Sequence, residues 1–179
     1  MPIGKPVTPA LLIVRALSAK ATTGVLTFGP LQIRCALGRS GKRWRKHEGD
    51  GASPSGTWTV RQAYYRADRL TRPKTSLKLT AIAPNAGWCD DSCDRNYNSP
   101  VTHPYPASAE HLWREDGLYD LIVVLGYNDT PRVKGRGSAI FLHVARSGYA
   151  PTEGCIAVAR PDLIRLLAAI SPKTKLVIS

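Results

Sequence analysis

Two residues near the C-terminal end of the chain have the types and spacing of a nucleophile and its base. His143 ends the apolar stretch 138–143, a loop containing Gly, Pro and Ser follows, and Gly154 places Cys155 before a second apolar stretch. Only a thiolate is a competent nucleophile, and a free thiol with a pKa of about 8.5 is mostly protonated at neutral pH. An imidazole beside the sulfur would take that proton and remain as a cation next to it. The pair therefore indicates thiol-based acyl transfer.

The glycine before the cysteine has a predicted role of its own. Because Gly154 has no side chain, the backbone can approach a substrate closely, and the N–H groups of Gly154 and Cys155 are candidates to bind an oxyanion. A structural interpretation of His143 and Cys155, as a hydrogen-bonded histidine and a small buried hydrophobe, stays open on these residues alone. The order His then Cys excludes papain-like enzymes, and the short gap excludes the caspase pattern.

The elements that must position this pair are mostly strands. A strand ending at His143 and a return loop bring positions 143 and 155 side by side. Period-two alternation and β-prone composition predict strands at 11–17, 25–28, 31–37, 57–64, 77–82, 119–126, 139–144 and 175–178. A helix is predicted over 161–170, where Pro161 opens an apolar face, and a weaker one over 107–115. This pattern predicts a mainly β single domain, sandwich or barrel.

Chain length and net charge limit the classes of protein to which this chain can belong. A chain of 179 residues with 43% hydrophobic residues favours one globular domain and excludes a wholly disordered chain. Lys and Arg number 25 against 13 acidic residues, a net charge of +12, which suits a polyanion or a carboxylate-rich polymer. No apolar stretch approaches the roughly 18 residues of a membrane-spanning helix, and residues 1–18 match a secretory signal poorly.

The other cysteines allow several interpretations. Cys35 alternates with polar residues and is predicted to be a buried strand residue. Cys89 and Cys93 lie in a polar loop, where a small disulfide or two free thiols are possible. Adding His103 would give a weak zinc pattern, which we do not expect to bind metal.

Three linked segments resemble one family. Residues 46–58, KHEGDGASPSGTW, resemble the DG-x-T/S-P-x-G-x-aromatic segment of the L,D-transpeptidase catalytic domain (YkuD-type) family. Residues 137–143 resemble that family's catalytic His strand, and 152–156, TEGCI, its S/T-x-G-C nucleophile motif. Segments 88–91, 96–98 and 126–128 resemble a divergent proteobacterial branch. The resemblance runs from about Leu31 to the C-terminal helix, so we expect one catalytic domain over 1–179, with its core at about 31–179.

The resemblance implies a fold and a reaction. The fold is an L,D-transpeptidase-type β-sandwich of mixed sheets with one or two peripheral helices. Cys155 would attack a carbonyl of a peptidoglycan stem peptide while His143 takes its proton, and a meso-diaminopimelate amine would then resolve the thioester. The cross-links would be of the 3,3 type, or of the 1,3 type from L-Ala in the divergent branch. Water in place of the amine would make an L,D-carboxypeptidase.

The resemblance also implies partners and location. Such enzymes need no metal or other cofactor, act in the periplasm or cell envelope, and are inhibited by carbapenems. No export signal is visible in the sequence. The substrate-binding residues expected from the resemblance are Thr152, Tyr127, Asn128, Trp88, Asp91, Tyr97 and Asn98, although turn chemistry is an alternative role for the Asn and Asp side chains.

Two departures from the common family pattern concern the nucleophile motif. Glu153 stands where the family commonly has His, and Ala157 stands where it commonly has Arg. Arg160 or another cation could take the place of that Arg.

Two functions from other classes remain as alternatives. A basic nucleic-acid-binding module would need basic and aromatic residues interleaved on one face, and only 61–69 has this character, so nucleic acid is not an expected partner. The other alternative is a catalytically silent peptidoglycan-binding domain with the same cleft.

Overall fold

Strands make up most of the regular structure in the computed structural model, which describes residues 10–179. The strands are β1 Leu11–Ala16, β2 Thr23–Phe28, β3 Leu31–Ala36, β4 Lys42–Arg43, β5 Ser53–Pro54, β6 Gly56–Tyr65, β7 Lys78–Ala81, β8 Ala86–Cys89, β9 Ser99–Thr102, β10 Ala109–His111, β11 Leu121–Leu125, β12 Phe141–Val144, β13 Ile156–Val158 and β14 Lys175–Ile178. A short 3₁₀ turn, η1 Ser147–Tyr149, and one α-helix, α1 Arg160–Ala169, complete the described elements. The predicted mainly β class is confirmed.

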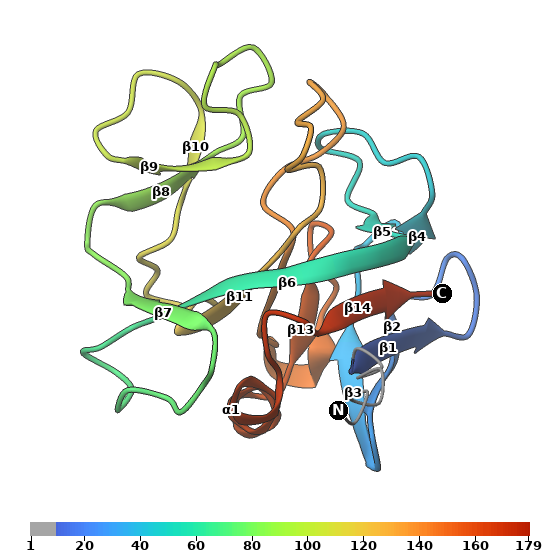
Figure 1. Cartoon of the computed structure of the whole chain (residues 1–179). Helices are drawn as coiled ribbons and strands as arrows, with labels where there is room; N and C mark the ends of the chain where they lie inside the picture. The colour runs from blue at the N-terminus through green and yellow to red at the C-terminus, as the bar shows by residue number, and fades with distance from the viewer. Residues whose placement is uncertain (1–9) are drawn as a thin grey trace, which may run out of the picture.

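The main sheet is mixed and curls around a core. Its order is β11-β12-β13-β3-β2-β1-β14-β6-β7, and β6 also pairs with β11, which joins the two sides of the sheet. The pairs β1–β14, β12–β13 and β6–β7 are parallel, and the other pairs in this sheet are antiparallel. A separate antiparallel sheet, β10-β8-β9, stands apart from it at the upper left of Figure 1.

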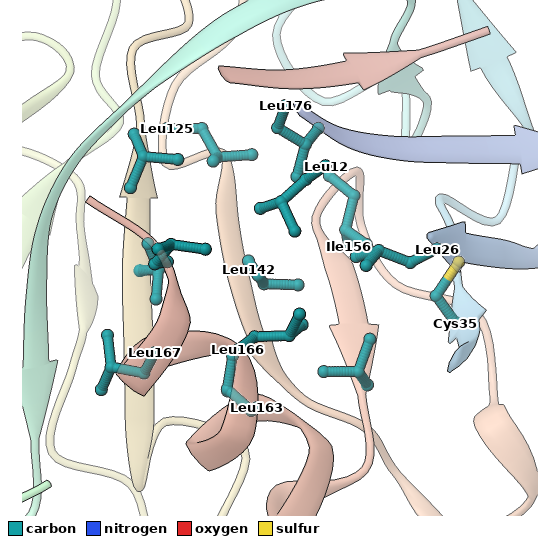
Figure 2. Packing of buried hydrophobic residues seen from close by; sticks show 14 of the residues in the cluster. Leu12, Leu26, Cys35, Leu125, Leu142, Ile156, Leu163, Leu166, Leu167 and Leu176 are labelled. Atoms are coloured by element: carbon teal, nitrogen blue, oxygen red, sulfur yellow. The ribbon is translucent and has the colours of Figure 1, made fainter. Parts of the chain in front are cut away.

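Helix α1 covers the core that the main sheet surrounds. The predicted helix is confirmed: Pro161 lies in the first turn, with Asp162 beside it, and the buried residues Leu163, Leu166 and Leu167 follow at helical spacing. Figure 2 shows these leucines against strand residues that include Leu142. Burying each leucine contributes about 1.5–3 kcal/mol, which anchors the helix to the sheet.

Strands β11 and β12 are buried on both faces. In β11, Leu121, Val123 and Leu125 face the core that contains α1, whereas Ile122 and Val124 belong to a second apolar cluster. The second cluster also contains Phe141 of β12 together with Trp88, Leu112, Leu118 and Tyr119. The period of two thus gives these strands an inner face toward the main core and an outer face toward residues 86–119. We call residues 86–119 the lobe.

One predicted helix is wrong. Residues 107–115 form β10 and turns instead, because Ala109–His111 pairs with β8 along Gly87–Cys89. The competing backbone hydrogen bonds come from a strand about twenty residues earlier, which local propensity does not reveal. Strands β8 and β9 were not predicted either.

The structure also describes the three remaining cysteines and part of the N-terminal segment. Cys35 is fully buried in β3, as predicted. Cys89 and Cys93 are both free thiols, and no metal-binding cluster of His, Cys, Asp or Glu occurs within residues 10–179. In the same range, no helix is long and apolar enough to cross a bilayer. The first half of the stretch judged a poor secretory signal, residues 1–9, lies outside the described residues.

Candidate active site

A cavity of about 410 Å³ lies between the outer face of the main sheet and the lobe. Besides sheet and lobe, the loops 46–49 and 146–153 contribute to its walls. Its polar and ionisable lining residues are Lys46, Glu48, Asp90, Glu110, Arg114, Tyr119, Ser138, His143, Arg146, Thr152, Glu153 and Cys155. Cys155 and His143 therefore share one cavity.

Strand register explains why these two residues meet. Strands β12 and β13 are parallel, with His143 opposite Ala157 and Leu142 opposite Ile156. Cys155 precedes Ala157 by two positions and therefore points to the same outer face as His143. Residues twelve apart in the sequence therefore line one cavity.

The sulfur of Cys155 is held by the backbone of the preceding loop and strand. The Phe141 N–H donates to Sγ at 3.3 Å, and the thiol donates to the Ala139 carbonyl at 3.1 Å. Cys155 retains 8% of its surface exposed, toward the cavity that it lines. The thiol proton is thus directed at Ala139, and none of the contacts within residues 10–179 joins Sγ to the His143 ring.

Neighbouring hydroxyl groups fix the loop that carries Cys155. Thr152 Oγ1 donates to the Cys155 carbonyl at 2.6 Å, and Ser53 Oγ donates to the same carbonyl at 3.4 Å. Gly154 has φ +133°, and a Cβ there would lie 2.8 Å from the Ala52 carbonyl oxygen, so glycine is required for the close approach. The Gly154 N–H donates to Thr152 Oγ1 at 3.2 Å. This contact occupies one of the two donors predicted for an oxyanion.

His143 is arranged as a proton acceptor. Its Nδ1 lies 2.8 Å from the Val144 carbonyl oxygen, which can only accept, so Nδ1 carries the proton and Nε2 has a free lone pair. Tyr119 packs edge-on against the ring, with centroids 5.3 Å apart. Burial lowers the pKa of His143 to about 4, because the charged imidazolium is poorly solvated there.

The expected resting ion pair is wrong for this structure. Burial and, to a smaller extent, the nearby Glu110 carboxylate raise the pKa of the Cys155 thiol to about 12, although the Phe141 N–H and Lys46 act in the opposite direction. A thiol with that pKa and an imidazole with a pKa of about 4 are both neutral at pH 7. At neutral pH the site therefore holds a thiol and a neutral imidazole rather than a preformed ion pair.

Charged groups line the rest of the cavity. Lys46 is buried and pairs with Asp50 at 2.7 Å. Tyr119 donates from its hydroxyl to Glu110 Oε1 at 2.6 Å, and Arg114 pairs with Asp116. The cavity thus combines a sheet wall that carries Cys155 and His143 with charged groups from the lobe and from the loop 46–49.

Of the seven residues expected to bind substrate, one lines the cavity. Thr152 does so, although its hydroxyl is already engaged with Cys155 and Gly154. Asn98 is instead a buried link between the lobe and the connection that joins β11 to β12. It accepts hydrogen bonds from Trp88 Nε1 and the Ala139 N–H, and it donates to the carbonyls of Tyr127 and Asn128.

The other expected residues support the surrounding loops. Tyr97 donates from its hydroxyl to Glu48 and accepts from the Gly137 N–H. Tyr127 donates to the Arg136 carbonyl, and Asn128 closes the loop 128–137 through Val133 and Gly137. Asp91 accepts from the Cys93 N–H, which is turn chemistry. Trp88 and Asn98 also line a second cavity of about 240 Å³.

Sequence reasoning missed most of the charged lining. Lys46, Glu48 and Ser138 lie inside the quoted motifs, but nothing in the motifs distinguishes the residues that face a cavity. Glu110 and Arg114 lie in the segment interpreted as a helix. Only the pairing of β10 with β8 turns Glu110 toward Cys155, so no local signal could have found it.

Comparison with known families decides the identity of the fold. The sequence matches the profile of the YkuD L,D-transpeptidase catalytic domain over residues 19–178. The chain belongs to this family. No curated protein sequence gives a significant match.

Solved L,D-transpeptidases are distant structural neighbours of this chain. L,D-transpeptidase 3 of Mycobacterium tuberculosis aligns with 96% of the chain at 11% identity and a TM-score of 0.45. L,D-transpeptidase 1 of the same organism aligns with 94% of the chain at 14% identity and a TM-score of 0.38. L,D-transpeptidase 3 of Mycobacterium tuberculosis in complex with a faropenem-derived adduct aligns with 96% of the chain at 16% identity and a TM-score of 0.39. The aligned regions cover 61%, 62% and 60% of those chains, so this YkuD domain spans about three fifths of their length.

The YkuD domain here departs from the common motif at two positions. Glu153 is at the exposed rim and pairs with Arg39 at 2.7 Å. Ala157 lies opposite His143 on the cavity floor. Arg160 does not replace the missing Arg, because it pairs with Asp120 and is not among the cavity residues. Arg114 and Arg146 are the arginines that line the cavity.

Proposed function

We propose that this chain is a cysteine L,D-transpeptidase, with Cys155 as nucleophile and His143 as base. The proposed substrate is a peptidoglycan stem peptide, and the product is a 3,3 or 1,3 cross-link to a diaminopimelate amine. The observation that carries the proposal is the convergence of Cys155 and His143 on one cavity through the β12–β13 register. Membership of the YkuD family supports the reaction class.

The first half-reaction forms a thioester. As Sγ attacks the stem-peptide carbonyl carbon, its proton passes to His143 Nε2, and the carbonyl oxygen becomes an oxyanion. Because the Gly154 N–H is engaged by Thr152, the Cys155 N–H is the remaining backbone donor of the two predicted. Collapse breaks the C–N bond, and the imidazolium gives its proton to the departing amine.

The second half-reaction releases the enzyme. An acceptor amine attacks the thioester carbonyl, a proton passes from its nitrogen to Nε2, and the C–S bond breaks. The imidazolium then returns that proton to Sγ. Attack by water in place of the amine gives the L,D-carboxypeptidase outcome.

The net charge of +12 suits binding to an envelope polymer that is rich in carboxylates. The proposed mechanism suits the same polymer as a substrate. We therefore place the activity in the periplasm or cell envelope, with a carbapenem as inhibitor. We also propose that the chain is a single catalytic domain and that its reaction needs no cofactor.

Incubation with purified muropeptides, followed by mass spectrometry, tests the proposal. Wild type should release a terminal residue and form dimers, and Cys155→Ala should do neither. Cys35→Ala is the matched control, because that thiol is fully buried in β3 and away from the cavity. Release without dimers would assign the carboxypeptidase, and the absence of any turnover that depends on Cys155 would overturn the proposal. A carbapenem adduct on Cys155, absent from Cys155→Ala, is the faster assay.

A further inference from the structure

The lobe places a carboxyl group in the cavity where the thioester would form. Glu110 of β10 lines the same cavity as Cys155. Tyr119 donates from its hydroxyl to Oε1 at 2.6 Å, and within residues 10–179 no hydrogen bond to Oε2 is present. The Tyr119 ring packs edge-on against His143 and against Phe141, at 5.3 and 5.9 Å. Glu110 is therefore held in fixed relation to the reacting pair.

This carboxyl group works against the first half-reaction. A negative charge on Glu110 raises the pKa of Cys155, so it disfavours ionisation of the nucleophile. A carboxylate at this place suits a cation that enters the cavity after the thioester has formed. The acceptor amine is such a cation, because an alkyl amine is protonated at neutral pH and must lose a proton before it can attack.

Unpartnered polar groups in the same cavity point to a polar ligand. Ser138 is 7% exposed, lines the cavity, and its buried hydroxyl has no hydrogen-bond partner within the described residues. Asp90 also lines the cavity, and its buried Oδ1 likewise lacks a partner there. Because buried polar atoms are normally satisfied, these atoms are suited to a ligand with several N–H donors.

We propose that Glu110 binds the ammonium group of the acyl acceptor and takes its proton, which makes the lobe wall the acceptor site. This inference rests on the proposed function. Arg114 and Arg146 line the same cavity and suit a carboxylate on the amine-bearing carbon. The ligand class is thus the zwitterionic end of an amino acid.

Every proton in this step has a donor and an acceptor. The ammonium gives one proton to the Glu110 carboxylate, and the freed lone pair attacks the thioester carbonyl carbon. The new C–N bond forms, the nitrogen loses its second proton to His143 Nε2, and the C–S bond breaks. Sγ takes the proton from His143, and Glu110 releases its own proton to solvent. Burial raises the pKa of Glu110, which makes its carboxylate a better proton acceptor.

Several groups act on the charge of Glu110 from the surrounding elements. The Tyr119 hydroxyl and Arg114 lower its pKa, whereas Asp90 and Glu48 raise it. The pair Arg114–Asp116 reduces the effect of the arginine.

The test separates the two half-reactions in Glu110→Gln. Gln keeps an acceptor for the Tyr119 hydroxyl but cannot take a proton. The matched control is Glu115→Gln. Glu115 lies in the same lobe, is exposed and pairs with Arg69 outside the cavity. A tetrapeptide stem serves as donor, and glycine, a small zwitterionic amine, or hydroxylamine, uncharged at neutral pH, serves as acceptor.

In Glu110→Gln, thioester formation, followed by intact mass, should be at least as fast as in wild type, because the substitution removes a negative charge that raises the pKa of Cys155. The ratio of glycine adduct to hydrolysis product should fall at least about tenfold, while the hydroxylamine ratio should not change. Glu115→Gln should behave as wild type in all three measurements. Glu110→Asp shortens the side chain and so withdraws the carboxylate, which should partly lower the ratio of glycine adduct to hydrolysis product. This variant replaces Glu110→Gln in the test if the Gln substitution prevents folding.

An unchanged glycine ratio in Glu110→Gln, or an equal loss with glycine and hydroxylamine, would overturn the acceptor site. Failure of the proposed function looks different, because wild type itself would then form no thioester before any acceptor is added.

Discussion

The two walls of the cavity are built in different ways. The sheet wall consists of neighbouring strands that are buried on both faces, and it places Cys155 and His143 by backbone register. The lobe wall is a smaller sheet with turns, and it contributes Asp90, Glu110 and Arg114. Burial under the lobe lowers the pKa of His143 and raises that of Cys155, which both lie on the sheet wall, whereas the lobe wall itself contributes charged side chains. The proposed chemistry and the proposed recognition of the acceptor therefore come from two regions of the chain.

Replacement of the base tests the sheet wall and should have the largest effect. His143→Gln removes the free Nε2 lone pair, and the rate of acylation by a carbapenem should fall about 10²–10⁴-fold. Intact-mass time courses measure this rate. His111→Gln is the control, because His111 belongs to the lobe, stacks on His103 and does not line the cavity. Equal rates for His143→Gln and wild type would remove His143 from the mechanism.

Replacement of the residue that joins the two walls should come next. Asn98→Ala leaves the buried Trp88 Nε1 and Ala139 N–H groups without their acceptor, and it should reduce the free energy of unfolding by about 3 kcal/mol. Urea denaturation measures this change. Asn96 donates from its side chain to the Tyr105 hydroxyl inside the lobe, so Asn96→Ala should cost less than about 1 kcal/mol. A similar cost for both variants would mean that the walls are not joined through Asn98.

Acid should destabilise the sheet wall through His143. Its pKa is about 4 in the folded state and about 6.5 when unfolded, so the unfolded chain binds the proton first as the pH falls. Stability should therefore fall from pH 6.5 to pH 4, by at most about 3 kcal/mol from this residue. Urea unfolding of wild type and His143→Gln over that range isolates the contribution, because carboxylates such as Asp50 titrate in both proteins. Parallel pH curves for the two proteins would contradict a buried neutral imidazole.

The exposed rim should matter least. Glu153 pairs with Arg39, but both side chains are more than half exposed, so solvent screens the pair. Glu153→Gln should change the free energy of unfolding by less than about 0.5 kcal/mol, as measured by urea denaturation. A change above 1 kcal/mol would show that Glu153 supports the nucleophile loop.

Short-range sequence patterns determined the indicated chemistry, the family and several secondary-structure elements of this protein. The types and order of His143, Gly154 and Cys155 indicated the chemistry, and the motifs around them indicated the family. Alternation in β3 and the apolar face of α1 predicted those elements, because each pattern reports one buried side of one element.

Only the tertiary structure decided which groups face Cys155. The segment 107–115 became β10 because β8 supplied its hydrogen bonds, and that pairing turned Glu110 into the cavity. Desolvation of Cys155 and His143 likewise depends on the lobe that covers the outer face of β12. Contacts between distant segments set both the second wall and the protonation of the pair, and no local pattern in the sequence encodes such contacts.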